Sequence, residues 1–252
     1  MTDLVALEGI SRHFGGVAAL DNVTMSISPG EAVALMGGNG AGKSTLVAIL
    51  SGLQRPDRGT VKVDGTERRF EEPKDARKLG IETVFQNLAL CGNLDAPGNL
   101  FLGREIGWGV RPFRLLRRRE MLDETRRTLE QLGVRIPDLH ATASSYSGGQ
   151  RQALAFARAA RARSRLLILD EPTAALGVEE SANVVATVRR LREERGIAVL
   201  LITHNLDEMR KIAERAIVLR RGRLVGTVPL AQADDDRIVS MITGSLTAGN
   251  LG

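Results

Sequence analysis

Cysteine, aromatic side chains and long apolar runs are all scarce in this chain of 252 residues. The single Cys91 rules out an intramolecular disulfide and is typical of a reducing compartment. The longest apolar runs, in RLLILD and IAVLLITH, are far too short to cross a bilayer. Because the start, MTDLVALEG, lacks the basic and apolar regions of a secretory signal, we expect a cytoplasmic location.

The composition is that of an ordinary globular protein, with 43% hydrophobic and 26% charged residues, which excludes disordered and fibrous classes. A net charge of +5 would permit contact with nucleic acid or an anionic membrane. The densest basic cluster, RPFRLLRRRE at 111–120, has no interleaved aromatic ladder on which bases could stack. We therefore interpret this cluster as a solvated face beside a helix and expect no nucleic-acid partner.

Short β runs dominate the first part of the chain. VALEGI, NVTMSIS and EAVALM read as strands, and the turn signal Pro29-Gly30 predicts a hairpin between the second and the third. A helix is expected over 42–50, followed by a strand pair at TVKVDG and IETVF.

The pattern changes after Phe85. The segments from 87 to 142 are predicted to be mainly helical, as an inserted helical subdomain. Beyond them helices and strands alternate, which predicts parallel strands covered by helices. The expected elements are helix 147–162, strand 165–170, helix 178–195, strand 197–202, helix 205–213, strands at RAIVLR and RLVGTV, and a last helix around DDDRIVSMI.

GGNGAGKST fits the phosphate-binding pattern G-x-x-x-x-G-K-[ST], between an apolar strand and a helix as that motif requires. Its backbone N–H groups would close around phosphate oxygens, Lys43 would reach the β and γ phosphates, and Ser44 would offer its hydroxyl to Mg²⁺. A merely glycine-rich turn is the alternative. The predicted nucleotide-binding residues are Gly37, Gly38, Asn39, Gly40, Ala41, Gly42, Lys43, Ser44 and Thr45.

LLILDE supplies a second half of a nucleotide site. Asp170 ends an apolar strand, where ligands of open α/β sheets gather, and it would hold a Mg²⁺-bound water. Neighbouring strand residues point to different sides, so Glu171 would face the water that attacks the γ-phosphate, as a general base or orienting group. Two solvated acids at a strand end are the alternative.

YSGGQRQALAFARAA has the spacing of a capping box between Ser147 and Gln150, which predicts a well-capped helix. A hydroxyl, the glycines Gly148 and Gly149 and a helix N-terminus also make a phosphate-binding surface. Both interpretations can hold together. Because the chain already has one phosphate loop, a second phosphate site needs another nucleotide or another subunit.

The order of GGNGAGKST, VFQN, YSGGQ, LLILDEP and ITHN is similar to the nucleotide-binding subunit of an ABC transporter over essentially the whole chain. The resemblance implies ATP and Mg²⁺ as ligands and a head-to-tail pairing of two copies, in which the SGGQ helix of one closes over the ATP of the other. It implies an α/β fold: a P-loop NTPase core with a mostly parallel sheet, an N-terminal antiparallel β subdomain and an inserted helical subdomain. We expect a single domain over 1–252, with the core at 1–86 and 163–252 and the helical subdomain at about 87–162.

The resemblance also assigns roles to three single residues. Gln86 would touch Mg²⁺ or the attacking water at the hinge of the helical subdomain, and His204 would contact the γ-phosphate and help hold Glu171. Phe14 lies where the family places an aromatic that stacks on adenine. Taken alone, His204 would more often be structural, and a core role for Phe14 stays open.

Several phrases resemble the ATPases of bacterial monosaccharide importers of the ribose, xylose and fructose type: GIETVFQNLALCGNLD, NLFLGRE, SSYSGGQRQ and DEPTAALGVEES. Membrane permease subunits would then dock on the segment after Gln86, a separate sugar-binding protein would deliver substrate to the permease, and the chain would lie on the inner face of the membrane. Importers of branched-chain amino acids share the FGG-x-x-AL start and remain the nearest alternative. A soluble ABC ATPase acting on ribosomes or nucleic acid is a further one, although it normally shows tandem domains or a long coiled-coil insertion.

The stretch LDEPTAALG departs from the usual family pattern, which continues Ser-Ala-Leu-Asp after DEPT. Gly177 is predicted to be the N-cap of the helix GVEESANVVATVRRLREER. Replacing an Asp cap by Gly costs only a few tenths of a kcal/mol, so the helix should still begin there. The carboxylate that in relatives helps link the two ATP sites is missing, so the departure concerns coupling and not hydrolysis.

Overall fold

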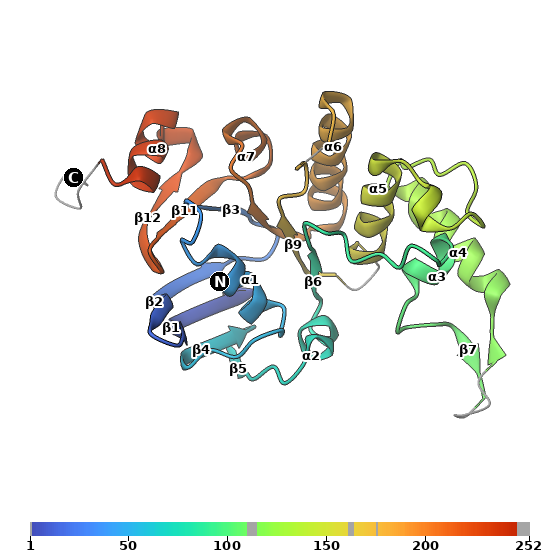
Figure 1. Ribbon diagram of the computed structural model, residues 1–252, viewed down its shortest axis with the longest axis horizontal. Coiled ribbons are helices and arrows are strands. Elements are labelled where there is room, and N and C mark those ends of the chain that lie inside the picture. Colours follow the sequence, from blue (N-terminus) through green and yellow to red (C-terminus); the bar gives the residue numbers. More distant parts are fainter. Residues whose placement is uncertain (1, 110–114, 161–163, 175, 246–252) are drawn as a thin grey trace.

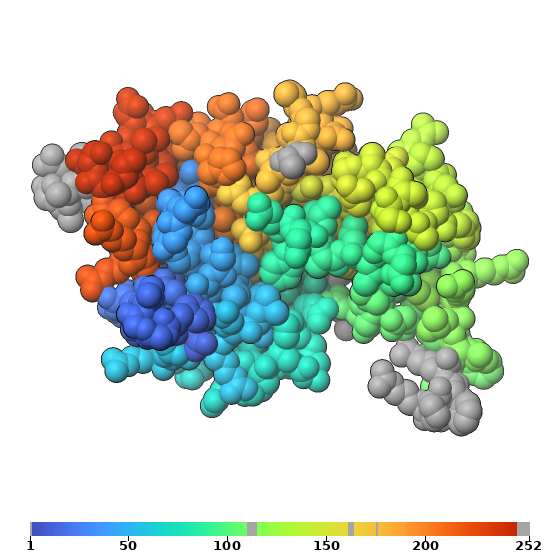
Figure 2. Space-filling model, viewed as in Figure 1, coloured from blue at the N-terminus to red at the C-terminus, as the bar shows by residue number. Residues whose placement is uncertain are grey.

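The computed structural model describes residues 2–109, 115–160, 164–174 and 176–245. A four-stranded sheet has the order β2-β1-β4-β5, and a six-stranded sheet has the order β12-β11-β3-β10-β9-β6. In Figure 1 the six-stranded sheet runs through the middle of the molecule, with α6 and α7 along its upper edge and the four-stranded sheet below it. The C-terminal α8 and the segment of α3 and α4 lie at opposite ends of the long axis (Figures 1 and 2).

The strands of the four-stranded sheet are β1 (Val5–Phe14), β2 (Val17–Ile27), β4 (Arg58–Val63) and β5 (Thr66–Arg68). Those of the six-stranded sheet are β3 (Ala32–Met36), β6 (Ile81–Val84), β9 (Leu166–Asp170), β10 (Ala198–Ile202), β11 (Arg215–Arg220) and β12 (Arg223–Pro229). The α-helices are α1 (Lys43–Leu50), α2 (Pro73–Lys78), α3 (Ala96–Leu100), α4 (Arg118–Gln131), α5 (Gly148–Ala159), α6 (Val178–Arg195), α7 (Leu206–Ile212) and α8 (Asp235–Thr243). A two-stranded pair, β7 (Gly107–Trp108) with β8 (Leu115–Leu116), and the 3-10 turns η1 (Ala143–Ser145) and η2 (Leu230–Gln232) complete the described elements.

The hairpin predicted around Pro29-Gly30 is wrong, because β2 and β3 belong to different sheets. β2 pairs antiparallel with β1, whereas β3 pairs parallel with β10 and β11. All five residues of β3 are buried, as expected for a central parallel strand covered on both faces. The turn residues mark where the chain bends but do not decide which sheet the next strand enters.

The strand pair predicted at TVKVDG and IETVF is wrong for the same reason. β4 pairs with β1 and β5, while β6 pairs parallel with β9 in the other sheet. The later alternation is confirmed, with α6 at the bounds predicted for it and β11 paired antiparallel with β12. The predicted helix 147–162 is shorter than expected: it begins at Gly148 and ends at Ala159, and 161–163 lie outside the described residues.

The segment 87–142 is less helical than predicted. Among its described residues the helices are α3, of 5 residues, and α4, of 14, and turns make up much of the remainder. The buried side-chain amide of Asn99 satisfies backbone groups of this segment that have no helix or strand partner. It accepts from the Cys91 backbone N–H at 2.7 Å and donates to the Cys91 and Leu94 carbonyls at 3.0 and 3.1 Å. Of the basic cluster, 111–114 lie outside the described residues, and the described remainder, 115–120, is exposed.

Separate apolar clusters pack on the two sides of the six-stranded sheet. One joins it to α1 and the four-stranded sheet, and another joins it to α3, α4, α5 and α6. A third lies under α7 and α8. None of the described helices combines the length and apolar character needed to span a bilayer.

Gly59 allows β4 to pass close to β1. Its φ is +88°, and a Cβ there would lie 2.5 Å from the Glu8 carbonyl oxygen and from the Gly9 backbone. We expect Gly59→Ala to lower the free energy of unfolding by about 1–3 kcal/mol, measured by urea denaturation. Gly16→Ala is the matched control, because a Cβ at Gly16 meets nothing within 4 Å. Equal stability of the two variants would contradict the close-approach argument.

Candidate active site

The loop between β3 and α1 contains three glycines with positive φ, two of which are also closely packed. Gly37, Gly40 and Gly42 have φ values of +155°, +73° and +104°. A Cβ at Gly37 would collide with the Leu219 carbonyl, and one at Gly42 would lie 2.5 Å from the Ala19 carbonyl oxygen. The loop therefore has the backbone conformation and close packing that the phosphate-binding motif needs.

Lys43, the first residue of α1, folds back over this loop. Its Nζ donates to the carbonyls of Gly37 at 2.6 Å and Gly38 at 3.0 Å. Burial lowers the pKa of Lys43, and the negative charges of Glu171 and Asp170 oppose that shift. The ammonium group thus lies between the loop and the two predicted acids.

Asp170 and Glu171 stand at the carboxyl end of β9. Burial raises the pKa of Asp170, the charge of Glu171 adds to this rise, and Lys43 counteracts it. Glu171 has a φ of +51°, which is rare for a residue with a side chain. Its backbone N–H donates to the Ile202 carbonyl of β10 at 2.9 Å.

Glu171 and His204 lie together, although 33 positions separate them in the sequence. His204 Nδ1 is 2.8 Å from Glu171 Oε2. The His204 side chain is 80% exposed and that of Glu171 is 19% exposed, so the imidazole lies on the open side of the carboxylate. The ring is not part of the core and lies against the predicted base, which favours the interpretation that His204 belongs to the site.

The donor set for a divalent cation fits Mg²⁺. Ser44 is exposed at the start of α1, Asp170 ends β9, and Gln86 is exposed two residues after the end of β6. Among the described residues no group of three or more His, Cys, Asp or Glu could hold a metal. A set with one carboxylate suits Mg²⁺, which usually keeps waters and substrate phosphates as its other ligands.

Phe14 is 46% exposed, so the alternative of a core role is wrong. The ring lies at the end of β1 under the guanidinium of Arg12, 5.1 Å from its centroid. β2, the partner of β1, carries the Ala19 carbonyl that abuts Gly42. The exposed ring therefore stands on the hairpin that also supports the phosphate loop.

Ser147 and Gln150 form the predicted capping box. Gln150 N–H donates to Ser147 Oγ at 3.2 Å, and Ser147 N–H donates to Gln150 Oε1 at 2.9 Å. α5 lies well apart from α1 in Figure 1, so the chain does not bring its SGGQ segment to its own phosphate loop. Ser147, Gly149 and Gln150 instead line a cavity of about 390 Å³ beside α6.

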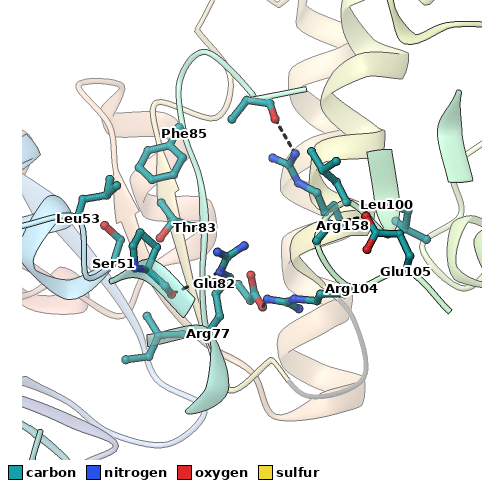
Figure 3. A pocket seen from close by; sticks show the side chains of 15 residues that line it. Ser51, Leu53, Arg77, Glu82, Thr83, Phe85, Leu100, Arg104, Glu105 and Arg158 are labelled. Atoms are coloured by element: carbon teal, nitrogen blue, oxygen red, sulfur yellow. Dashed lines mark hydrogen bonds and ion pairs between the residues drawn. The ribbon is translucent and has the colours of Figure 1, made fainter. Parts of the chain in front are cut away.

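A larger cavity, of about 650 Å³, lies between the core sheet and the segment after Gln86 (Figure 3). Arg104 Nη2 and Glu82 Oε1 form an ion pair of 2.5 Å on its wall. Burial raises the pKa of Glu82, and the hydrogen bond from Arg104 counteracts this rise. Exposed Leu53 and Leu102 also line the cavity, which makes it partly apolar.

Sequence reasoning missed Arg158 and Glu208. Arg158 of α5 donates to the carbonyls of Leu88 at 2.8 Å and Ala89 at 2.6 Å, two consecutive residues with positive φ just after Gln86. Glu208 of α7 is buried and bonded to two threonines near Glu171 and His204. Neither residue has a local sequence signal, since both belong to helices whose charged residues are usually solvated.

A family model described as ABC transporter matches residues 20–174. The xylose/arabinose import ATP-binding protein XylG of Sulfolobus acidocaldarius is 42% identical over 253 residues, covering 100% of this chain and 99% of that protein. The fructose import ATP-binding protein FrcA of Rhizobium meliloti is 39% identical, with 96% and 94% covered. The ribose import ATP-binding protein RbsA 1 of Rubrobacter xylanophilus is 43% identical over 97% of this chain, which spans 48% of that longer protein.

Solved structures share the fold. A dimeric ATP-binding cassette in a post-hydrolysis state bound to ADP and Pi has a TM-score of 0.75 and 27% identity, covering 90% of this chain and 98% of that one. A nucleotide-free ATP-binding cassette from an ABC transporter has a TM-score of 0.79 and 24% identity, with 96% and 95% covered. The predicted P-loop NTPase fold with an antiparallel N-terminal sheet is confirmed.

Glu171→Gln should leave ATP binding nearly intact and lower the hydrolysis rate by about 10²–10⁴-fold, because the amide keeps the size but cannot take a proton. Nucleotide titration and phosphate release measure the two effects separately. Turnover at the wild-type rate in this variant would show that Glu171 is not the base.

Lys43→Ala should act on binding instead. It removes the ammonium group that reaches the phosphates, so we expect the Kd for ATP to rise by about tenfold or more. The same titration, with far-UV circular dichroism as a check on folding, measures this change. An unchanged Kd would contradict the placement of Lys43 in the nucleotide site.

Proposed function

The chain belongs to the ABC transporter family, and on that premise we propose that it is the ATP-binding and ATP-hydrolysing subunit of a monosaccharide importer. The observation that carries the catalytic part is the 2.8 Å contact between His204 and Glu171 beside the phosphate loop. The names of the relatives, which are import proteins for xylose/arabinose, fructose and ribose, support a monosaccharide as the transported substrate.

The residues of the loop and its flanks would perform the binding. Backbone N–H groups of 38–44 and the N-terminus of α1 favour phosphate oxygens, and Lys43 adds a positive charge. Phe14 offers an exposed ring for stacking on adenine. Ser44, Gln86 and Asp170 would hold Mg²⁺, which supplies positive charge beside the phosphates when it is bound.

Glu171 would orient the attacking water and accept its proton. His204 holds that carboxylate in place, and its exposed edge is free to face the γ-phosphate. The positive charge of Lys43 counteracts the rise in the pKa of Asp170, and the negative charges of Glu171 and Asp170 oppose the burial that lowers the pKa of Lys43. Catalysis on this proposal is positioning and electrostatic stabilisation, as is general for phosphoryl transfer.

A second copy of the chain would complete each ATP site. Ser147 and Gly148 are exposed at the N-terminus of α5, where a helix dipole favours an anion. The solved cassette that is dimeric and bound to ADP and Pi supports a dimer, and the family resemblance implies a head-to-tail pair in which this segment covers the nucleotide of the partner. Gly177 caps α6 without a side chain and so brings no carboxylate to the coupling of the two sites.

Permease subunits would dock in the 650 Å³ cavity beside the segment after Gln86 (Figure 3). The cavity joins apolar Leu53 and Leu102 to the charged pair Glu82–Arg104, so a partner helix could bury apolar side chains there. The subunit would then lie on the cytoplasmic face of the membrane, and a sugar-binding protein would act only indirectly. The division into a core at 1–86 and 163–252 and a helical subdomain at about 87–162 belongs to this proposal, with 1, 110–114, 161–163, 175 and 246–252 outside the described residues.

Reconstitution with its permease in liposomes tests the proposal. We expect ATP hydrolysis that rises several-fold when a sugar-loaded binding protein is added, and sugar uptake that requires ATP. Stimulation by a branched-chain amino acid would favour an importer of branched-chain amino acids. Stimulation by DNA or RNA at physiological salt, without any effect of the permease, would favour a soluble ABC ATPase that acts on ribosomes or nucleic acid.

The matched variants Leu102→Asp and Val239→Asp sharpen this test. Leu102 is 42% exposed and lines the cavity, whereas Val239 is 43% exposed on α8, at the other end of the molecule. A charge at Leu102 should abolish most of the permease stimulation, and the same charge at Val239 should not. Equal stimulation of the two variants would remove the cavity from the docking proposal.

A further inference from the structure

We propose that Glu208 is a positioning residue that ties the segment of Glu171 to the segment of His204, and so sets the contact between these two side chains. The inference rests on the proposed ATP hydrolysis and adds a residue that no motif identifies. Thr173 follows Glu171 by two positions, and Thr203 immediately precedes His204.

One carboxylate oxygen bridges the two segments. Glu208 Oε2 accepts from Thr203 Oγ1 at 2.7 Å and from Thr173 Oγ1 at 3.0 Å. Thr203 Oγ1 in turn accepts from the backbone N–H of Asn205 at 3.1 Å. The chain leaving β9 and the chain leaving β10 are therefore joined through a single side chain of α7.

The environment of Glu208 is unusual for a carboxyl group. Its relative exposure is 4%, and within the described part of the chain its Oε1 is buried without a hydrogen-bond partner. Burial raises the pKa of Glu208, the two threonine hydroxyls counteract this rise, and the charge of Glu171 adds to it. Such a costly placement implies that the acceptor at Oε2 is needed where it is.

The held segment is strained. Glu171 has a φ of +51°, a backbone conformation that a residue with a side chain adopts only when its surroundings impose it. Three hydrogen bonds hold this segment: Glu171 N–H donates to the Ile202 carbonyl at 2.9 Å, Ala174 N–H donates to the Glu171 carbonyl at 3.1 Å, and the Thr173 hydroxyl donates to Glu208 at 3.0 Å. Without Glu208 the segment can relax, and the 2.8 Å contact between Glu171 and His204 can open.

Capping of α7 does not explain why a carboxylate is buried at Glu208. Asn205 Oδ1 accepts from the backbone N–H of Glu208 at 3.1 Å, and this cap survives any substitution of the Glu208 side chain. Asp207, the preceding residue of the same helical turn, is exposed. Asp207→Ala is therefore the matched control for a lost acid in the first turn of α7.

Three variants, Glu208→Ala, Glu208→Gln and Glu208→Asp, distinguish the position of the acceptor oxygen from the negative charge of the side chain. Glutamine keeps an acceptor at the same reach, so its kcat for ATP should stay within about threefold of the wild type. Alanine and aspartate, which lose or retract the acceptor, should lower kcat by at least about tenfold, since small misplacements of catalytic groups are costly. The Kd for ATP should change by less than about twofold, because the phosphate loop is untouched.

Thr173→Val provides a second, milder route to the same loss. It removes one of the two bonds while keeping the side-chain volume, so its kcat should fall in the same direction as that of Glu208→Ala. In the double variant the two losses should not multiply, because both remove one bridge. Multiplicative losses would show that the two residues act separately and would overturn the proposal.

Nitrogen NMR of the imidazole rings tests the positioning without any need for turnover. The chain has three histidines, and we expect the ring signals of His204 to move in Glu208→Ala and Thr173→Val but not in Asp207→Ala, while those of His13 and His140 stay unchanged. Unchanged His204 signals and kcat in Glu208→Ala would overturn the proposal, as would a loss in Glu208→Gln as large as in Glu208→Ala. If the wild type fails to hydrolyse ATP, the proposed function fails, and the His204 signals still decide the role of Glu208.

Discussion

The parallel pairing of β10 between β3 and β9 is the constraint on which the candidate site depends. Ile202 of β10 lies level with Leu35 of β3 and with Asp170 of β9. The phosphate loop, the two acids and His204 therefore leave the sheet at the same edge. Because parallel strands share their hydrogen-bonding direction, a slip of β10 by one residue would move His204 away from Glu171 and turn its side chain to the other face.

Electrostatics at this edge depend on partial burial. Burial lowers the pKa of Lys43 and raises the pKa of Asp170, and the charge of each residue opposes the shift of the other. The glycines of the loop permit this crowding, since the Leu219 and Ala19 carbonyls approach them from β11 and β2. The four-stranded sheet thus supports the phosphate loop as well as the exposed ring of Phe14.

The other side of the sheet carries α5 and the segment after Gln86, which are bonded to each other. Arg158 of α5 holds the turn at Leu88 and Ala89, which follows Gln86, and Arg104 pairs with Glu82 of β6. The helix that begins at SGGQ is therefore bonded to the loop that carries Gln86. The guanidinium of Arg158 therefore links the start of the segment after Gln86 directly to α5.

Local chemistry determined much of this protein before any folding was considered. The phosphate loop, the acids after LLIL, the Ser147–Gln150 cap and the start of α6 at Gly177 depend on neighbours within a few residues, so the sequence predicted them. It failed at Pro29-Gly30, because a turn does not specify the sheet of the next strand. It also missed Glu208, whose partner Thr173 lies 35 positions away. The family resemblance implied that His204 helps to hold Glu171, but local chemistry could not show it. Only the tertiary structure decided the burial of Glu208 and the 2.8 Å contact of His204 with Glu171, because these contacts exist only once β9 and β10 pair along the sheet.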